Sequence, residues 1–175
     1  MPEENKPSVW IGCLACYNEG HLLGEWYDLN DAQDVTVEML HETVRRPVGS
    51  HEELWVFDKE NLPIDGECSP LDIAPWATAY ERLGDDLWPA FCAWEHSGED
   101  TEQDASLEAF EDQYAGRWES FADYARDLAD GIALLDGVRE EITRYFDWQA
   151  WTRDPEQEHA TAIAPGGGVF VFRSV

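Results

Sequence analysis

Acidic residues alternate with large apolar residues along the whole chain, and this pattern restricts what the chain can fold into. The sequence contains 38 Asp and Glu against 11 Lys and Arg, which gives a net charge of −27. The acids are spread evenly, with 13 in residues 1–60, 12 in residues 61–110 and 13 in residues 111–175. An acidic tail would instead concentrate its charge in one block. We therefore expect the carboxylates to cover the surface of a folded body.

The composition also narrows the class of protein and the kind of partner. Hydrophobic residues make up 43% of the chain, enough for a core, so disorder is not expected despite the charge. A strongly negative surface repels nucleic acid and anionic membranes, so the expected partners are basic surfaces. Residues 1–7 do not resemble a signal peptide, and no apolar run approaches the roughly 20 residues of a membrane span. A cytoplasmic protein with free thiols is the simplest interpretation.

The first third of the chain predicts a small antiparallel sheet with one helix packed on it. Strands are expected at residues 8–16, 21–29 and 53–58. In the first strand, Val9, Ile11 and Cys13 share one face. A helix over residues 32–43 is expected to begin at a cap, either Asn30 or Asp31.

The remainder of the chain predicts several short helices and a closing hairpin. Helices are expected over residues 71–83, 86–96, 106–114, 121–129, 137–146 and 147–153. Ser120 and Asp123 resemble a capping box at the start of the fourth of these helices. Gly84 separates the first two helices, and Pro155 is expected to end the last one. Residues 158–164 and 169–173 are expected to pair as a hairpin.

Cys13 and Cys16 have the two-residue spacing of zinc and redox sites, but the expected strand argues against that use. Positions three apart in a strand point to opposite faces. The histidines form no recognisable ligand pair, and they stand at positions 21, 41, 51, 96 and 159. Neither a nucleophile elbow nor a phosphate-binding loop is present. We therefore expect buried thiols, no metal, no cofactor, no catalytic residue and no enzyme activity.

Regularly spaced carboxylates on helices can imitate the phosphates of duplex DNA. Acids four apart on a helix are separated by about 6 Å of rise. That is roughly two of the steps of about 3.4 Å between phosphates on one strand. The acidic residues expected to form such a partner-binding surface are Glu99, Asp100, Glu102, Asp104, Glu108, Glu111, Asp112, Glu119, Asp123, Asp127, Asp130, Glu140, Glu141 and Asp147.

Three blocks of the sequence resemble the ArdA family of antirestriction proteins. Residues 11–20 (IGCLACYNEG) and 23–29 (LGEWYDL) are similar to the family's Cys-Leu-Ala-x-Tyr-Asn-x-Gly stretch and the Gly-x-Trp-x-Asp-Leu that follows it. Residues 109–124 (AFEDQYAGRWESFADY) resemble its Phe-x-Asp-x-Tyr-x-Gly-x-(aromatic)-x-Ser-Phe segment. Residues 145–154 (YFDWQAWTRD) resemble its Tyr-(apolar)-Asp-x-x-x-(aromatic)-x-Arg-Asp, and the closing strand at 169–173 matches too.

The resemblance implies an elongated α+β protein of three small domains. These would be an N-terminal sheet and helix at 1–61, a helical domain at 62–104, and a C-terminal domain of helices and a short hairpin at 105–175. It also implies a homodimer whose acidic surface imitates bent DNA, with the family's antirestriction motif near residues 128–145. The implied target is the modification and specificity core of type I restriction–modification enzymes, and the host is commonly a mobile genetic element.

Two other interpretations of the acidic composition remain open at this point. The chain could be an acidic DNA-mimic partner of another DNA-binding protein, such as a nucleoid or repair factor. It could also be an enzyme of unknown activity from a salt-adapted cell, in which surface acids serve solubility. DNA competition and the salt needed for folding distinguish the three.

Overall fold

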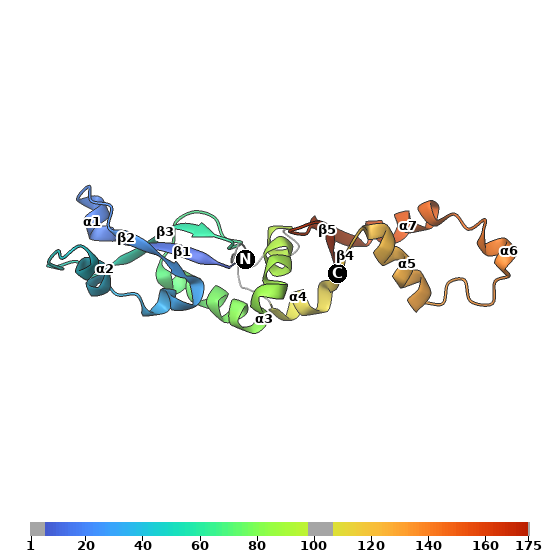
Figure 1. Ribbon diagram of the computed structural model, residues 1–175, viewed down its shortest axis with the longest axis horizontal. Helices are drawn as coiled ribbons and strands as arrows, with labels where there is room; N and C mark the ends of the chain where they lie inside the picture. Colours follow the sequence, from blue (N-terminus) through green and yellow to red (C-terminus); the bar gives the residue numbers. More distant parts are fainter. Residues whose placement is uncertain (1–5, 98–106, 175) are drawn as a thin grey trace. The chain divides into compact units, whose positions relative to one another are not determined.

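The computed structural model describes residues 6–97 and 107–174 and has a mixed α+β fold, as expected. The chain divides into two compact units, one formed mainly by residues 1–92 and the other mainly by residues 93–175. Each unit contains a three-stranded antiparallel sheet (Figure 1). The division into domains at 1–61, 62–104 and 105–175 stays a prediction. In the part of the chain that is described, no helix combines the length and apolar character that crossing a membrane requires.

The sheet of the first unit has the strand order β2-β1-β3. The strands are β1 (Ser8–Cys13), β2 (Gly24–Asp28) and β3 (Leu54–Glu60). Val9, Ile11 and Cys13 are fully buried on one face of β1, which confirms the alternation expected from the sequence. The opposite face carries Trp10, whose ring lies against the backbone of Gly24 on the neighbouring strand.

Short helical segments connect these strands. They are α1 (Leu14–Asn18), the 3-10 helix η1 (Leu29–Asp34) and α2 (Val37–Thr43). The expected helix over 32–43 is therefore in two pieces, and the expected cap at Asn30 or Asp31 is wrong because both residues lie inside η1. Thr36 caps α2 instead, because its side chain accepts a hydrogen bond from the Met39 N–H at 3.3 Å.

A long helical segment, α3 (Pro70–His96), follows β3. Its backbone is non-helical at Gly84, where φ is 68° and ψ is −179°, so two helices meet there as the sequence predicted. Ser69 begins the first of them, since its hydroxyl accepts a hydrogen bond from the Leu71 N–H at 3.2 Å. Trp76, Trp88 and Phe91 are buried along this segment, which gives these three aromatic residues a core role.

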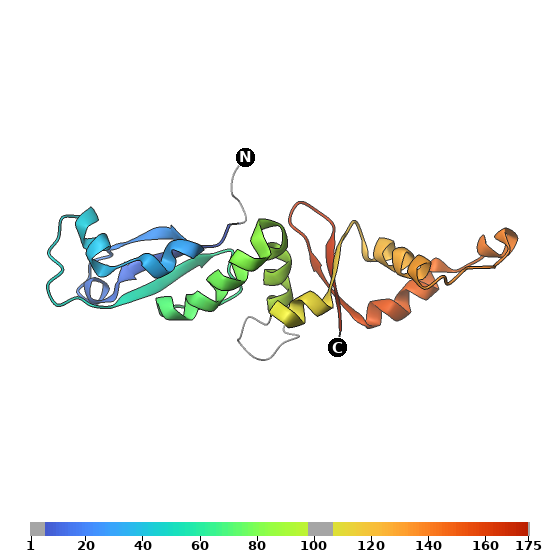
Figure 2. The same cartoon turned by 90° about the horizontal axis from the view of Figure 1, so that it is seen from below.

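The second unit contains a sheet with the strand order β4-β6-β5 and the helices around it. Its elements are α4 (Leu107–Gln113), β4 (Tyr114–Trp118), α5 (Phe121–Gly131), α6 (Glu140–Thr143), α7 (Trp148–Gln157), β5 (His159–Ile163) and β6 (Val169–Arg173). The hairpin of β5 and β6 was predicted, but β4 was not. Helices α5 and α7 pack against each other beside this sheet (Figure 2).

Two helix boundaries in the second unit correct the sequence-based prediction. The helix expected over 137–146 is only α6, because Gly137 has a positive φ of 71° and Arg139 is extended. Pro155 does not end the last helix, since α7 continues to Gln157. Pro155 has no N–H to donate, but its side chain is buried, and the Glu158 N–H donates to its carbonyl oxygen at 3.0 Å.

Candidate functional site

The acidic side chains lie on the surface and not in the core. Among the Asp and Glu of residues 6–97 and 107–174, Glu95 and Asp123 are half-buried, and every other one is exposed. The chain has 38 acids and 11 Lys and Arg, so most carboxylates cannot have a basic side chain of their own. The folded units therefore present a dense negative charge to any partner.

Helix α5 shows how one element holds several of the expected acids. Asp123, Asp127 and Asp130 follow one another at spacings of four and three residues, which places them on one side of the helix. The other side buries Tyr124 and Ala125 inside the second unit. The burial of that apolar side orients the carboxylates outward, as the hydrophobic periodicity predicted.

Not every acid on α5 is equally available to a partner. The Asp123 carboxylate accepts a hydrogen bond from Ser120 at 2.6 Å and lies 3.4 Å from the guanidinium of Arg126. Asp127 and Asp130 are exposed and lie further along the helix, beyond the capping interaction of Ser120 and Asp123. Asp123 therefore has a structural role in addition to any role in binding.

The acids of α4 and of the strand that follows it are also exposed. Glu108, Glu111 and Asp112 lie on α4, whose Phe110 is 1% exposed and fixes the helix to the core. Glu119 follows β4 directly and is exposed. The four carboxylates are therefore available at the surface, and their role in binding a partner stays a prediction.

The remaining described candidates surround α6 and the start of α7. Glu140 and Glu141 lie in the first turn of α6, and Glu140 is 3.2 Å from Arg144 one turn later. Asp147 caps α7 by accepting a hydrogen bond from the Ala150 N–H at 2.9 Å. Glu140 and Asp147 therefore also stabilise their own helices, although both are exposed.

Some of the expected acids lie outside the described part of the chain, and the first unit has further exposed acids that were not expected to bind a partner. The expected residues Glu99, Asp100, Glu102 and Asp104 lie outside the described residues. The first unit carries exposed acids of its own, which were not among the expected binding residues. They include Glu25, Asp28, Asp31 and Asp34. The even spread of acids along the sequence was the sign that the first unit could also contribute to the acidic surface.

The structure overturns the reason for rejecting a role of Cys13 and Cys16. Strand β1 ends at Cys13, and Cys16 lies in α1, so the two side chains turn toward each other and not to opposite faces of a strand. The Cys16 N–H donates a hydrogen bond to Cys13 Sγ at 3.5 Å. Burial raises the pKa of the Cys16 thiol, and the neighbouring Cys13 thiol raises it further.

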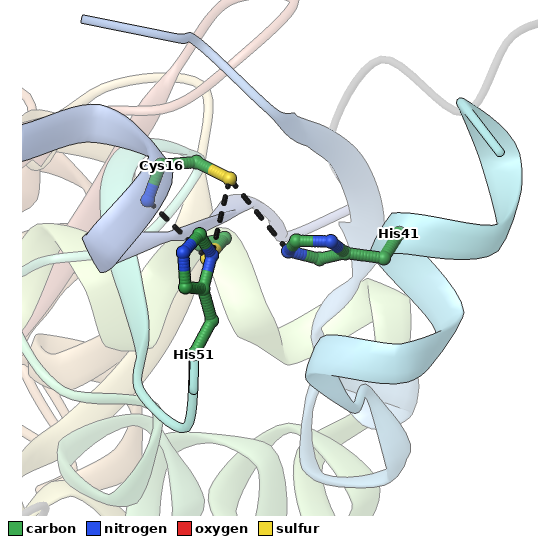
Figure 3. A group of neighbouring side chains, drawn as sticks. Cys16, His41 and His51 are labelled. Atoms are coloured by element: carbon green, nitrogen blue, oxygen red, sulfur yellow. Dashed lines mark hydrogen bonds between the residues drawn. The ribbon is translucent and has the colours of Figure 1, made fainter. Parts of the chain in front are cut away.

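Two histidines that are distant in the sequence lie beside these thiols. Cys16 Sγ is 3.6 Å from His41 Nε2 and 3.4 Å from His51 Nδ1 (Figure 3). The donor atoms of Cys13, Cys16, His41 and His51 all lie within 4.8 Å of one another, so they could hold a metal ion. The expectation of scattered histidines is wrong for this pair.

Comparison with protein families supplies the context for the acidic surface. The sequence model of the family described as antirestriction protein (ArdA) matches residues 9–170. The chain belongs to the ArdA antirestriction family. Among curated proteins, the comparison found no matching sequence.

The ArdA match covers both compact units and most of the blocks that carried the resemblance. It includes residues 11–29, 109–124 and 145–154, and it ends at the second residue of β6. In the structure these blocks form β1 to β2, then α4 to the first turn of α5, then the turn into α7 and most of α7. The ArdA family is one of inhibitor proteins, so the exposed carboxylates are candidates for contact with a protein target.

Proposed function

We propose that the chain is an acidic DNA mimic that occupies the DNA-binding groove of type I restriction–modification enzymes and blocks restriction. The observation that carries this proposal is the exposure of almost every described carboxylate on folded units. Membership of the ArdA family gives the general class of function, which is antirestriction. The mimicry of DNA and the type I target are the steps that we add.

The physical basis of the proposed mimicry is the density of fixed negative charge. Along α5, Asp123 and Asp127 are four residues apart, which corresponds to about 6 Å of helix rise. Phosphates on one DNA strand are about 3.4 Å apart along the axis, so this spacing covers roughly two phosphate steps. A groove lined with Arg and Lys for phosphates would attract such a surface, and opposite charges can speed association by about 10- to 1000-fold.

A second proposed contact surface lies in the segment from residue 132 to residue 145. Four apolar side chains are exposed between residues 132 and 145, and they are Ile132, Val138, Ile142 and Tyr145, which are 59%, 38%, 52% and 87% exposed. Exposed apolar groups clustered in one segment of sequence are typical of protein contacts. We infer that this segment contributes to a homodimer contact or to the interface with the target. We also infer that the protein acts in the cytoplasm of a cell that receives a mobile genetic element.

A DNA-displacement assay tests the proposal directly. Labelled duplex DNA is bound to a purified type I methyltransferase, and the chain is added at a series of salt concentrations. We expect the chain to displace the DNA, with an affinity that falls steeply as salt rises. Separate restriction and methylation assays show whether one or both activities are blocked.

The same assay distinguishes the two alternative functions. Failure to displace DNA from the methyltransferase, together with displacement from an unrelated nucleoid protein, would favour an acidic partner of that other class. A chain that unfolds without molar salt and displaces no DNA would favour a salt-adapted protein.

A further inference from the structure

Four neighbouring parts of the first unit bring two thiols and two imidazoles together at one point. Cys13 is the last residue of β1, Cys16 belongs to α1, His41 belongs to α2, and His51 lies in the segment that leads into β3. In Figure 3 the sulfur of Cys16 faces the rings of both His41 and His51. The proposed function uses acids on the surface, so this interior cluster needs a separate explanation.

The distances within the cluster are those of the ligands of a tetrahedral zinc ion. Zinc bonds of about 2.3 Å to sulfur and about 2.0–2.1 Å to nitrogen place neighbouring sulfur and nitrogen ligands roughly 3.5 Å apart. Cys16 Sγ lies 3.6 Å from His41 Nε2 and 3.4 Å from His51 Nδ1, and Cys13 Sγ lies 3.4 Å from His51 Nδ1. These three separations match that expectation.

A set of hydrogen bonds alone does not account for the arrangement as well as a metal ion does. Nδ1 of His51 has one position for a hydrogen bond in its ring plane, yet both sulfurs lie 3.4 Å from it. Its single lone pair can accept only one linear hydrogen bond, so two thiols that share this nitrogen form weaker bonds than either would form alone. Four ligands around a central ion avoid this competition, because each bond points to the same centre.

Each histidine is held with its other ring nitrogen directed at a hydrogen-bond acceptor. His41 Nδ1 is 3.0 Å from the carbonyl oxygen of Pro47, and His51 Nε2 is 3.2 Å from the carboxylate of Glu19. When these nitrogens donate to the two oxygens, the lone pairs of His41 Nε2 and His51 Nδ1 face the sulfurs. Zinc-binding histidines have this second contact to a carbonyl or carboxylate as a rule.

The burial and the ligand types indicate a structural ion and not a catalytic one. Cys13 and Cys16 are fully buried, His41 is 1% exposed, and the His51 side chain is 13% exposed. Four protein ligands would fill the tetrahedral sphere and leave no position for water or substrate. Two sulfurs and two imidazole nitrogens suit zinc, whereas magnesium and calcium prefer oxygen ligands.

We propose that Cys13, Cys16, His41 and His51 bind one zinc ion that joins the junction of β1 and α1, helix α2 and the segment before β3 to one another. Structural zinc sites contribute directly to the stability of small domains. The proposal is independent of DNA mimicry, since none of its ligands belongs to the acidic surface.

The first measurement uses the full chain, purified without added metal or chelator. Elemental analysis should find about one zinc per chain, and removal of zinc by a strong chelator should lower the midpoint of thermal unfolding of the first unit. Zinc should restore that midpoint, and magnesium should not. Cobalt added to the metal-free chain should produce the visible absorption of a tetrahedral site and a thiolate-to-cobalt charge-transfer band.

Variants assign the site to these residues. Cys16→Ser and His51→Gln should each lower zinc affinity at least 100-fold, whereas Cys68→Ser, which changes a thiol outside the cluster, should leave zinc content unchanged. Glu19→Gln, which weakens only the contact behind His51, should lower zinc affinity by about 10-fold.

Two results would overturn the proposal. One is a wild-type chain that holds less than a tenth of a zinc per molecule and gives no tetrahedral cobalt spectrum. The other is zinc retained by Cys16→Ser at the level of Cys68→Ser. If Cys16→Ser does not fold, the cobalt spectrum of the wild-type chain decides, because its charge-transfer band requires a thiolate ligand.

Discussion

Ser120 and Asp123 form a reciprocal pair at the start of α5. The Ser120 hydroxyl donates to Asp123 Oδ2 at 2.6 Å, and the Asp123 N–H donates to Ser120 Oγ at 3.3 Å. The Asp123 N–H, which lies in the first turn and has no acceptor four residues earlier in the helix, is shared between the Ser120 hydroxyl and the Ser120 carbonyl oxygen at 3.1 Å, and the pair orients the first carboxylate of the acidic side of α5. Local stability and the direction of surface charge therefore depend on the same two side chains.

Ser120→Ala tests the stabilising part of this relationship. Loss of a capping side chain typically costs about 1 kcal/mol, so the free energy of unfolding should fall by about that amount. Urea denaturation followed by circular dichroism measures the change. Gln149→Ala, on the exposed surface of α7, should change the same quantity by less than about 0.5 kcal/mol. Equal effects of the two substitutions would contradict the prediction.

Gly24→Ala tests the close contact between β2 and Trp10. A Cβ at Gly24 would lie 2.5 Å from the Ile11 carbonyl oxygen and 2.6 Å from the Trp10 ring, so the free energy of unfolding should fall by about 1–3 kcal/mol. Gly131→Ala is the matched control, because no atom lies within 4 Å of a Cβ there and φ is not positive. It should raise stability by about 0.4–1 kcal/mol. Thermal unfolding of both variants gives the comparison.

Neutralising the acids should affect DNA displacement collectively. An exposed charge pair is worth about 0–1 kcal/mol, so Asp127→Asn or Asp130→Asn alone should weaken displacement by less than about fivefold. The same two changes combined with Glu140→Gln and Glu141→Gln should weaken it by at least about tenfold and reduce its dependence on salt. The double variant Asp127→Glu, Asp130→Glu keeps the charge and should resemble the wild type. A complete loss of inhibition from one neutralisation would show that a single contact dominates.

Ile142→Asp should weaken self-association if the segment from 132 to 145 forms a dimer contact. The Ile142 side chain is 52% exposed, so a charge there costs little in the folded monomer but would be buried in an interface. Sedimentation equilibrium measures the dissociation constant, which should rise by at least about tenfold. Leu71→Asp adds the same charge at another exposed apolar position and should leave the constant unchanged. A monomeric wild type at every concentration would refute a dimer.

The sequence predicted the elements whose signals are local. Val9, Ile11 and Cys13 share the buried face of β1 as alternation required, and Ser120 caps α5 as its spacing to Asp123 indicated. Strand β4 was missed because its register with β6 shifts between Tyr114 and Gly116, where Gly116 has a φ of 105°. A strand of five residues with such an irregularity has no clean alternation to detect.

The cysteine–histidine cluster was missed for a different reason. Its recognition depended on where β1 ends, and boundaries are weakly encoded when a strand passes directly into a helix, as at Cys13 and Leu14. His41 and His51 are ten residues apart, outside the spacing of common zinc motifs. The turn-forming residues Pro47 and Gly49 between them were the available sign that the chain could bring both rings back to the thiols.

The outward position of nearly all described carboxylates has an evolutionary consequence. Apart from acids such as Asp123 and Asp147 that cap a helix, these side chains take little part in folding, so an acid can move to a neighbouring position at little cost to stability. Under the proposed function, the target has no comparable freedom, since the basic groups that would hold these carboxylates also hold its own substrate. A restriction enzyme that evolved to bind this surface less tightly would at the same time bind DNA less tightly.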